Sequence, residues 1–465
     1  MIIVFLQSTL YMQRTNLLFT DALKLKRPNA FQVMLKPAGP SCNLNCTYCY
    51  YLEKNKLFQG RNSLRMSDDL LENFIKQFIE ANEIPVVTFT WQGGEPTLMG
   101  LGFFRKAIEL QKRYSGGKKI DNAFQTNGTR LNDEWCNFFT DNKILVGISI
   151  DGAEHNHDRY RKTFSGGATF KSVMKGIELL QKHKVEFNTL SVVNDYNVHF
   201  ASETYRILKQ IGSVFMQFLP VVERIADDPG KTNLSLVAPA YGDEASVTSW
   251  SVPPVEFGKF LITIFDEWVR NDVGRYYVQI FDTTLANWVG EMPGICVFSE
   301  TCGDALVMEH NGDLFSCDHF VYPEYFLGNI AEVPLIEMVK SQQQFDFGID
   351  KRNRLPQYCL QCEVRFACHG ECPKHRFTIT PDGKPGLNYL CKDYKIFFHH
   401  VEPYMEFMAK ELKYKRPPAN VMNWIRNKDN QVIKSVTPER NAPCPCGSGK
   451  KFKNCCAGNP LYNRV

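Results

Sequence analysis

The grouping of its sixteen cysteines constrains this chain more than any other feature. Fifteen of them fall into four groups with short spacings, and only Cys136 stands alone. Disulfide frameworks are typical of short secreted domains. This chain has 465 residues, and its apolar start lacks the positive region of a signal peptide. Core thiols without a role would be spread evenly, so the grouping favours metal ligation.

The composition is that of a globular protein. Hydrophobic residues make up 44% and charged residues 22% of the chain, which argues against disorder and coiled coil. The net charge of +4 is small for this length, so we expect no nucleic-acid partner. No apolar stretch approaches the roughly eighteen residues that a membrane helix needs, so we expect no membrane partner.

Strand and helix patterns alternate between residues 31 and 220, which predicts an α/β fold with a parallel sheet, open or closed. The continuous apolar run 144–152 predicts a strand buried on both faces. Ser67 is the expected N-cap of the first helix. The expected strands are 31–37, 86–91, 122–129 with its closing turn, 144–152, 187–194 and 213–222, and the expected helices are 67–83, 101–114, 132–142 and 170–184.

The remaining chain has fewer periodic segments. Residues 225–255 are rich in Ala, Pro, Gly, Asp and Ser, which is typical of a surface insertion. Helices are expected at 254–272 and 400–415, and the cysteine-rich stretch 290–395 is expected to be organised around metal. Residues 414–441 are polar and charged, which predicts a linker.

The first cysteine group forms the segment CNLNCTYC, with Cys42, Cys46 and Cys49. Three thiolates on one short loop can hold three irons of a four-iron cluster and leave the fourth iron open for a small molecule. A structural zinc site needs four protein ligands. No further Cys or His follows within about forty residues, so the pattern favours the iron–sulfur cluster over zinc.

A second motif follows the strand 86–91, in the order Gln92-Gly93-Gly94-Glu95-Pro96. Glycines allow a close approach between backbone and ligand, and Glu95 can pair with an ammonium group. Ligands bind beyond the carboxyl ends of parallel strands, where this motif is expected to lie. Together with the cysteine loop, the motif predicts a ligand site.

With these motifs, residues 31–400 resemble the radical S-adenosylmethionine (SAM) enzymes, and more closely the anaerobic sulfatase-maturating enzymes. The segments LKPAGPSCNLNCTYCYY, FTWQGGEPTLMGLGFF, QTNGT, LVGISIDG and VEFNTLSVV carry this resemblance. It implies a partial (β/α)6 barrel with the site at the carboxyl ends of the strands. It also implies that Cys42, Cys46 and Cys49 ligate a SAM-binding [4Fe-4S] cluster.

The resemblance assigns further residues to SAM. Gly94 and Glu95 are expected at its methionine moiety, Tyr51 beside its adenine, and Ser149 and Arg161 as polar contacts. Without the resemblance, Ser149 is an ordinary strand serine and Arg161 a surface arginine. Val222 stands where the family has a leucine that packs on the adenine, so only an apolar or backbone contact is expected there.

The second and third cysteine groups together supply eight thiolates. By spacing alone they fit two fully ligated four-iron clusters or two zinc sites. They resemble the SPASM extension of the same enzymes, which implies two auxiliary [4Fe-4S] clusters. On that pattern the first is ligated by Cys296, Cys302, Cys317 and Cys372, and the second by Cys359, Cys362, Cys368 and Cys391.

Asp318 directly follows Cys317. A carboxylate beside a cluster and a buried site can accept a proton, and the resemblance makes Asp318 the expected catalytic base. Without it, Asp318 is better explained as a turn residue of a hairpin. Gln92 and the loops near Asp318 are candidates for holding a peptide backbone.

The last group, Cys444, Cys446, Cys455 and Cys456, has the pattern C-x-C-x8-C-C with a Gly-Ser-Gly turn. It predicts a small zinc knuckle and resembles the SEC-C module. The zinc either folds the tail only or also presents it to a partner.

Five segments are expected along the chain. The domains are expected at 1–30 (N-terminal extension), 31–255 (radical SAM core), 256–411 (connecting helix, SPASM domain and closing helix), 412–440 (linker) and 441–465 (zinc module).

The family resemblance implies a cytoplasmic oxidoreductase that converts a Cys or Ser of an unfolded sulfatase to Cα-formylglycine, with flavodoxin or ferredoxin as electron donor. The alternatives are another SPASM enzyme, which forms thioether or carbon–carbon crosslinks, and a non-catalytic iron–sulfur or zinc regulator.

Overall fold

The computed structural model describes residues 29–58, 64–226, 234–239, 241–242, 245–436 and 439–458. The expected N-terminal extension therefore lies outside the described residues, except for Asn29 and Ala30. No helix in the described ranges is both long enough and apolar enough to cross a membrane.

One ten-stranded sheet organises the body, in the order β12-β11-β10-β1-β2-β3-β4-β5-β6-β9. Neighbouring strands from β10 to β9 in this order pair in parallel, whereas β11 and β12 are antiparallel. The strands are β1 (Gln32–Lys36), β2 (Val86–Trp91), β3 (Lys119–Thr126), β4 (Leu145–Ser149), β5 (Phe187–Val193), β6 (Phe215–Pro220), β9 (Tyr277–Val278), β10 (Ala305–Glu309), β11 (Asp313–Phe315) and β12 (Phe326–Asn329). The expected partial barrel, built on the six parallel strands β1 to β6, is confirmed.

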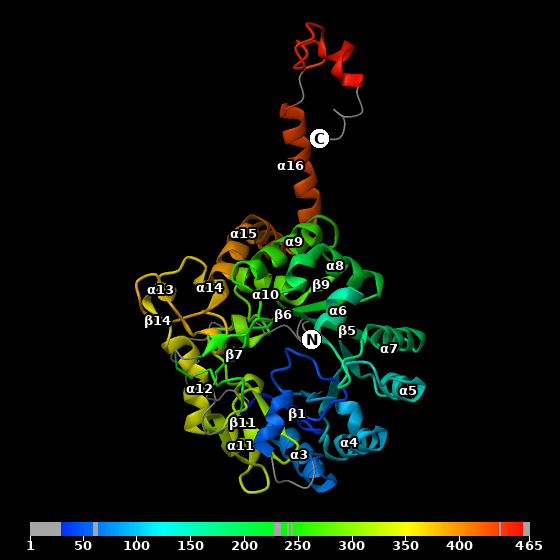
Figure 1. Ribbon diagram of the computed structural model, residues 1–465, viewed down its shortest axis with the longest axis vertical. Coiled ribbons are helices and arrows are strands. Elements are labelled where there is room, and N and C mark those ends of the chain that lie inside the picture. Colours follow the sequence, from blue (N-terminus) through cyan, green and yellow to red (C-terminus); the bar gives the residue numbers. More distant parts are fainter. Residues whose placement is uncertain are drawn as a thin grey trace.

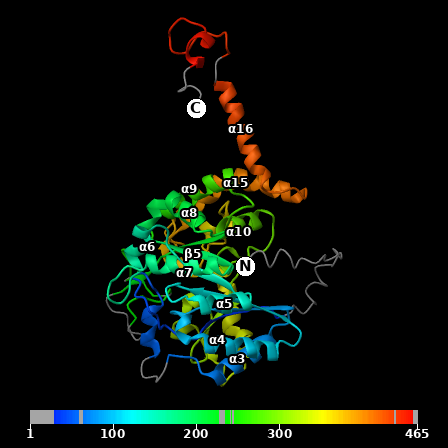
Figure 2. The same ribbon diagram turned by 90° about the vertical axis from the view of Figure 1, so that its right-hand side faces the viewer.

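Helices connect the parallel strands and cover the outside of the sheet (Figures 1 and 2). Ser67 caps α3 as expected, because its hydroxyl accepts a hydrogen bond from the Leu70 amide. The helices of the barrel are α3 (Asp68–Ala81), α4 (Leu101–Tyr114), α5 (Asp133–Asp141), α6 (Glu154–Tyr160), α7 (Phe170–Lys182) and α8 (Ala201–Gln210). Short pairs, β7 (Arg224–Ile225) with β8 (Ser246–Val247) and β13 (Thr378–Ile379) with β14 (Pro385–Leu387), lie outside the main sheet.

The two faces of the sheet have different environments. In β4, Val146 and Ile148 are fully buried against the helices, whereas Leu145, Gly147 and Ser149 are only half-buried. The expectation of a strand buried on both faces is therefore wrong. Successive side chains of a strand point to opposite faces. The half-buried inner face lines the interior of the partial barrel.

The cysteine-rich region joins the barrel sheet directly. Strand β10 pairs in parallel with β1, so that Lys36 lies opposite Glu309. On the inner face of these strands, Met34 packs against a small apolar cluster of Val307, Phe315 and Val321. This pairing carries the segment around Asp318 to the end of β1.

The C-terminal half is mainly helical. Helices α9 (Glu256–Asn271), α10 (Gln279–Trp288) and α15 (Cys391–Lys413) pack together beyond the β6 edge of the barrel. Between α10 and α15 lie the short helices of the cysteine-rich region, which are α11 (Leu335–Val339), α12 (Gln342–Asn353), α13 (Gln357–Leu360) and α14 (Arg365–Cys368).

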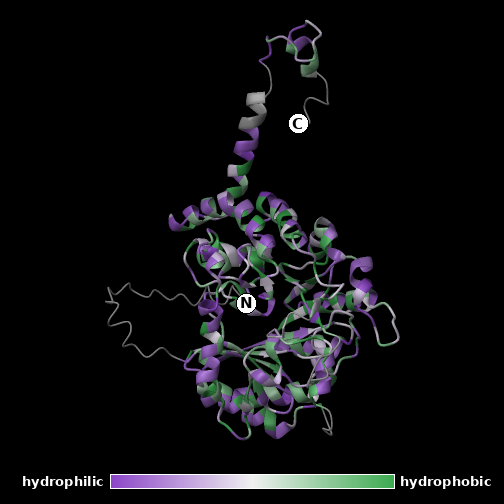
Figure 3. Ribbon diagram, turned by 60° about the vertical axis from the view of Figure 1, so that its left-hand side comes forward, coloured by the Kyte–Doolittle hydropathy of each residue, from purple (hydrophilic) through white to green (hydrophobic). Residues whose placement is uncertain are grey.

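The segment expected to be a linker contains a helix, α16 (Asn420–Val436). Its first turns are anchored because Val421 and Ile425 are buried and Trp424 stacks on Phe407 at 4.9 Å between ring centroids. Beyond this base residues 426–430 are hydrophilic, and α16 extends away from the body with the last cysteine group at its far end (Figures 1 and 3). The anchoring residues follow helical spacing, which the overall polarity of the segment conceals.

Candidate functional site

The loop that carries Cys42, Cys46 and Cys49 follows the carboxyl end of β1. Backbone hydrogen bonds fasten it to the end of α6 and the residues that follow, from the Thr47 amide to the Tyr160 carbonyl at 3.0 Å and from the Asn45 amide to the Lys162 carbonyl at 2.7 Å. The three thiols are half-buried and form no disulfide. Burial raises the pKa of Cys46 to about 11 even though Arg161 opposes the rise, so its thiolate is favoured only when a metal takes the charge.

The Gly93-Gly94 turn packs directly on this loop. The Gly94 amide donates to the Gly39 carbonyl and the Glu95 amide to the Ser41 carbonyl. A Cβ atom on Gly94 would lie 1.9 Å from the Ser41 carbonyl oxygen, so only glycine fits. The turn therefore fixes the backbone immediately before Cys42.

Glu95 is completely buried, and its carboxylate holds two neighbouring turns. Oε1 accepts from the Thr97 amide and from the Thr97 and Thr126 hydroxyls, at 2.7 to 3.1 Å. Among the described residues, Oε2 accepts only from the Asn127 amide at 2.8 Å, which leaves it one further acceptor position. Glu95 thus has a structural role that the sequence did not indicate, and one lone pair remains for a ligand.

The turn after β3 contacts the cysteine loop from the other side. The Asn127 amide group lies 3.8 Å from Cys42 Sγ and donates to Asn43 at 2.9 Å. The Asn43 side chain in turn donates to Thr129 at 2.8 Å. Asn127 was not among the expected site residues, although it belongs to the QTNGT segment.

Arg161 is buried beside the cysteine loop, so the surface alternative for it is wrong. It makes a bidentate ion pair with the fully buried Asp151, at 2.9 and 3.0 Å. The Tyr48 hydroxyl donates to the same carboxylate, and the guanidinium lies 5.5 Å from the Tyr48 ring centroid. Sequence reasoning missed Tyr48 and Asp151. Two features of the sequence could have identified them: Tyr48 is an aromatic residue between Cys46 and Cys49, and Asp151 follows the apolar run of β4.

Ser149 and Val222 occupy different environments. Ser149 lies on the inner face of β4, where its hydroxyl accepts from Gln125 Nε2 at 3.0 Å. Val222 follows β6 and is 2% exposed within the main core, which allows it apolar contacts only. At the end of β2, Gln92 Oε1 is buried and has no hydrogen-bond partner among the described residues.

Tyr51 belongs to a second group of side chains around Asp318. The Tyr51 hydroxyl donates to Glu309 at 2.6 and 2.7 Å, and its ring packs 3.3 Å from Lys36 Nζ. Lys36 also pairs with Asp318, which accepts a hydrogen bond from the Tyr50 hydroxyl. The contacts of Tyr51 therefore place it with Asp318, whereas Tyr48 accompanies Arg161.

The carboxylate of Asp318 is held in its charged form. Burial raises its pKa, but the charges of Lys36 and His319 and the hydrogen bonds from Lys36 and Tyr50 outweigh that effect, so the pKa lies below its usual value. Lys36 is 1% exposed and Asp318 lies in the partly enclosed interior of the barrel. An anionic acceptor for a proton is therefore available there.

The eight thiols of the cysteine-rich region separate into two sets of four. Charges on Cys296 and Cys372 raise the pKa of Cys317, after the larger effect of burial, and Cys296 acts in the same way on Cys302. In the other set, after burial, Cys391 and Cys359 raise the pKa of Cys368. Cys359 and Cys362 do the same to that of Cys391. These electrostatic neighbours group the thiols in the way the resemblance implies, and the two ligand sets themselves stay a prediction.

Helix α12 supports the first set with a polar face. Gln344 Nε2 donates to the Gly303 carbonyl at 2.7 Å, and a Cβ on Gly348 would lie 2.4 Å from the Cys302 carbonyl oxygen. The fully buried Lys351 donates to the carbonyls of Cys296, Val297 and Ser299. One ammonium group therefore holds the turn that begins at Cys296.

Replacing Lys351 with methionine is expected to remove one cluster. The unbranched apolar stem is nearly kept, but three buried carbonyls lose their charged donor. Iron in the anaerobically reconstituted protein should fall from about twelve to about eight per chain. Lys340→Met, at an exposed position after α11, is the control. Unchanged iron in Lys351→Met would contradict this role.

The tail thiols form a tighter group than the others. Within the described part of the chain, only Cys444, Cys446, Cys455 and Cys456 place three or more potential ligand atoms within 4.8 Å of one another. Sγ of Cys446 lies 3.4 Å from that of Cys444 and 3.5 Å from that of Cys455. Zn–S bonds of about 2.3 Å in a tetrahedron require separations of this order. The tail fits a single ion, whereas the other thiol sets are more widely spaced.

The variant Cys446→Ser is expected to lose the zinc and to keep the chemistry of the body. Zinc measured by mass spectrometry should fall from about one ion per chain to near none, because a three-thiolate site is incomplete. SAM cleavage should not change, since the tail stands at the end of α16 away from the barrel (Figure 1). Lys453→Ala serves as the control, and zinc retained in Cys446→Ser would refute the assignment.

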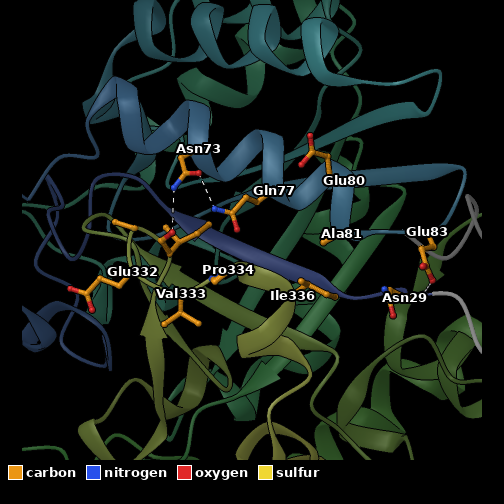
Figure 4. A pocket seen from close by; sticks show the side chains of 12 residues that line it. Asn29, Asn73, Gln77, Glu80, Ala81, Glu83, Glu332, Val333, Pro334 and Ile336 are labelled. Carbon is orange, nitrogen blue, oxygen red and sulfur yellow. Dashed lines mark hydrogen bonds between the residues drawn. The ribbon is translucent and has the colours of Figure 1, made fainter.

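A separate groove of about 630 Å³ lies at the opposite end of the barrel. Figure 4 shows Asn73 and Gln77 of α3 on one wall and Pro334 and Ile336 on the other. Asn29, which precedes β1, closes one end through a hydrogen bond to Glu83. The cysteine loop follows the other end of β1, so this groove is not part of the site described above.

Comparisons with known proteins agree with this arrangement. The family described as the Radical SAM superfamily matches residues 37–206, an iron–sulfur cluster-binding domain (SPASM) matches 296–363, and the SEC-C motif matches 440–458. The chain is 52% identical over 395 residues to a serine-type anaerobic sulfatase-maturating enzyme of Bacteroides thetaiotaomicron, covering 85% of this chain and 95% of the relative.

More distant relatives include a cysteine-type anaerobic sulfatase-maturating enzyme of Clostridium perfringens, at 33% identity over 82% of this chain and 99% of the relative. The structure of native anSMEcpe with bound AdoMet and the Cp18Cys peptide superposes with a TM-score of 0.71 at 31% identity, over 82% of this chain and 99% of that chain. Streptococcus suis SuiB, at 12% identity and a TM-score of 0.53, shares the fold.

Proposed function

We propose that this chain, which belongs to the anaerobic sulfatase-maturating enzymes of the radical SAM superfamily, oxidises a serine of a sulfatase to Cα-formylglycine. Members of this family convert Ser or Cys to formylglycine, and the chain is accordingly an oxidoreductase. The 52% identity to a serine-type enzyme, against 33% to a cysteine-type one, is the observation that favours serine.

Enzymes of this family use SAM and three [4Fe-4S] clusters, and the residues present fit these groups. Three free thiols on one loop and two further sets of four supply the ligands. The Gly94 turn allows close approach of the backbone, and Gln92 Oε1 is a buried acceptor without a partner among the described residues. When bound, SAM and its cluster supply a carbon radical that takes a hydrogen atom from the Cβ of the substrate.

Cys42, Cys46 and Cys49 would hold the cluster that binds SAM. We assign the remaining acceptor position on Glu95 Oε2 to the SAM ammonium group. Ser149 and Arg161 would bind polar groups of SAM from the inner face, with Asp151 fixing the guanidinium. Tyr51 remains the residue proposed beside the adenine, and Tyr48 is proposed to hold Arg161 in place through its contacts with Arg161 and Asp151.

Asp318 would receive the hydroxyl proton of the substrate serine. Oxidation of CH₂OH to CHO removes a hydrogen atom from Cβ, a proton from oxygen and one electron. Lys36 keeps the carboxylate ionised before the substrate binds, and Tyr50 orients it by a hydrogen bond. Gln92 and the loops near Asp318 are proposed to hold the peptide backbone.

The remaining assignments complete the proposal. The proposed substrate is an unfolded sulfatase polypeptide, and the proposed reductant is a flavodoxin or ferredoxin. The proposed location is the cytoplasm, where thiol-ligated clusters are protected from oxidation. The radical SAM core is assigned to residues 31–255 and the SPASM region, with its flanking helices, to 256–411. Residues 412–440, which include α16, separate the body from the zinc module at 441–465.

Isotope transfer tests the proposed function. A roughly twenty-residue peptide with the sulfatase-type Ser-x-Pro-x-Arg segment carries deuterium on the serine Cβ, and the anaerobically reconstituted enzyme receives SAM and dithionite. We expect deuterium in the 5′-deoxyadenosine and an aldehyde in the peptide. SAM cleavage without deuterium transfer would reject this substrate, and a crosslinked peptide would favour another SPASM chemistry.

A further inference from the structure

We propose that the surface around α13, α14 and the start of α15 is the docking site for a small acidic one-electron carrier protein. This redox face consists of Tyr358, Leu360, Arg365, Phe366, Lys392 and Lys395. The inference rests on the proposed function and deepens it, because it names where the electron partner of that reaction binds.

The positive charge of the protein is concentrated in this region. Residues 351–400 contain nine lysines and arginines against four carboxylates, whereas the whole chain has 54 against 50. Two of the four carboxylates, Glu371 and Asp393, are buried and hydrogen-bonded internally. Lys351 is buried as well, and the exposed Glu363 pairs with Lys395 at 3.2 Å, so the surface of this region keeps a moderate positive charge, which complements an acidic partner.

The redox face also exposes apolar side chains. Leu360 is 38% and Phe366 46% exposed, although Phe366 is held edge-on against Trp288 at 4.6 Å between ring centroids. Arg365 donates to the Leu360 carbonyl at 3.4 Å, which joins the two short helices. A fixed apolar centre with cations around it has the composition of a specific protein interface.

The thiols of the second auxiliary set lie directly below these side chains. Cys359 and Cys362 flank Leu360 in the chain, and both are half-buried, as is Cys391 at the start of α15. Lys395 acts electrostatically on Cys359, Cys362 and Cys391. It also lies 5.2 Å from the Tyr358 ring centroid. A partner protein that covers Leu360 and Phe366 would therefore lie close to the cluster that these thiols are proposed to ligate.

The electron balance of serine oxidation calls for such a partner. SAM cleavage consumes one electron, and conversion of the hydroxymethyl group to an aldehyde releases one electron beyond the transferred hydrogen atom and the proton. A one-electron carrier that binds in both redox states supplies the first and accepts the second. Encounters of this kind use small, charged interfaces that form quickly and weaken with salt.

Binding of a purified acidic flavodoxin to the reconstituted enzyme tests the docking site. Lys392→Glu combined with Leu360→Gln should weaken the dissociation constant, measured by fluorescence anisotropy, at least tenfold, with a reduced salt dependence. Iron content and dithionite-driven SAM cleavage should stay as in the unmodified enzyme. Lys171→Glu, at an 89% exposed position on α7 across the body in Figure 1, should bind normally.

Three results would overturn the docking site. In the first, the double variant binds flavodoxin as tightly as the unmodified enzyme. In the second, Lys171→Glu weakens flavodoxin binding as much as the double variant does. In the third, the unmodified enzyme does not bind flavodoxin even at low salt. The binding measurement does not depend on the substrate. An unmodified enzyme that binds flavodoxin at the redox face but leaves the serine peptide unchanged with dithionite would reject the proposed function and retain the docking site.

Discussion

Replacing Asp318 with asparagine is expected to slow formylglycine formation by about 10²- to 10⁴-fold while SAM cleavage continues. Asparagine keeps the size of the side chain and the hydrogen bond from Tyr50 but cannot accept a proton. It also leaves the buried Lys36 without its counterion. The residues proposed to hold SAM follow other strands, so SAM cleavage should continue although formylglycine is not formed.

Two readouts separate this effect from misfolding. Mass spectrometry follows the peptide, while chromatography measures 5′-deoxyadenosine in the same samples. The exposed Asp382→Asn, in the turn between β13 and β14, should behave like the unmodified enzyme. Equal product yield from Asp318→Asn, or equal loss of SAM cleavage and product, would contradict a role as the proton acceptor.

Replacing Asp151 with asparagine should weaken both the protein and its SAM site. Asp151 is fully buried and accepts from Arg161 twice, from Tyr48 and from the Val192 amide. Removing the charge leaves a buried guanidinium unpaired, which costs about 3–5 kcal/mol. Arg161 should then shift from its place beside Cys46, and SAM affinity should fall at least tenfold.

Anaerobic thermal unfolding and equilibrium binding of SAM measure these two effects. We expect the unfolding midpoint to fall by several degrees, because a loss of this size is a large part of typical domain stability. Asp195→Asn is the matched control, since that carboxylate is less buried and accepts from Tyr160. A midpoint and a SAM affinity both like those of the unmodified enzyme would show that the ion pair is unimportant.

The sequence predicted the barrel well because each strand and helix of that region buries a periodic apolar face. The expected strand 86–91 and helix 101–114 have the bounds of β2 and α4. Helix α12 was not predicted, because its inner face consists of Gln344, Gly348 and Lys351 instead of apolar residues. Gln344 and Lys351 donate hydrogen bonds to backbone carbonyls of the segment 296–303. Hydrophobic periodicity does not detect a helix of this kind.

Long-range pairing limited the prediction of the site. Pairing of β10 with β1 joins residues more than 250 positions apart, and it brings Asp318 to Lys36. No local pattern specifies this register. Tyr48 and Tyr51 differ by three positions, yet the turn after Cys49 directs one to Arg161 and the other to Glu309. Motif spacing identified the loop, and only the structure distinguished its tyrosines.

The central claim is the oxidation of a sulfatase serine to formylglycine, and competition between two peptides tests it most directly. Reconstituted enzyme, SAM and dithionite receive equal amounts of Ser and Cys versions of one sulfatase-type peptide, followed by mass spectrometry. We predict a loss of about 2 Da on the Ser peptide, with a kcat/KM at least equal to that for the Cys peptide and its loss of about 18 Da. Conversion of the Cys peptide alone, or of neither peptide while SAM is cleaved, would contradict the claim.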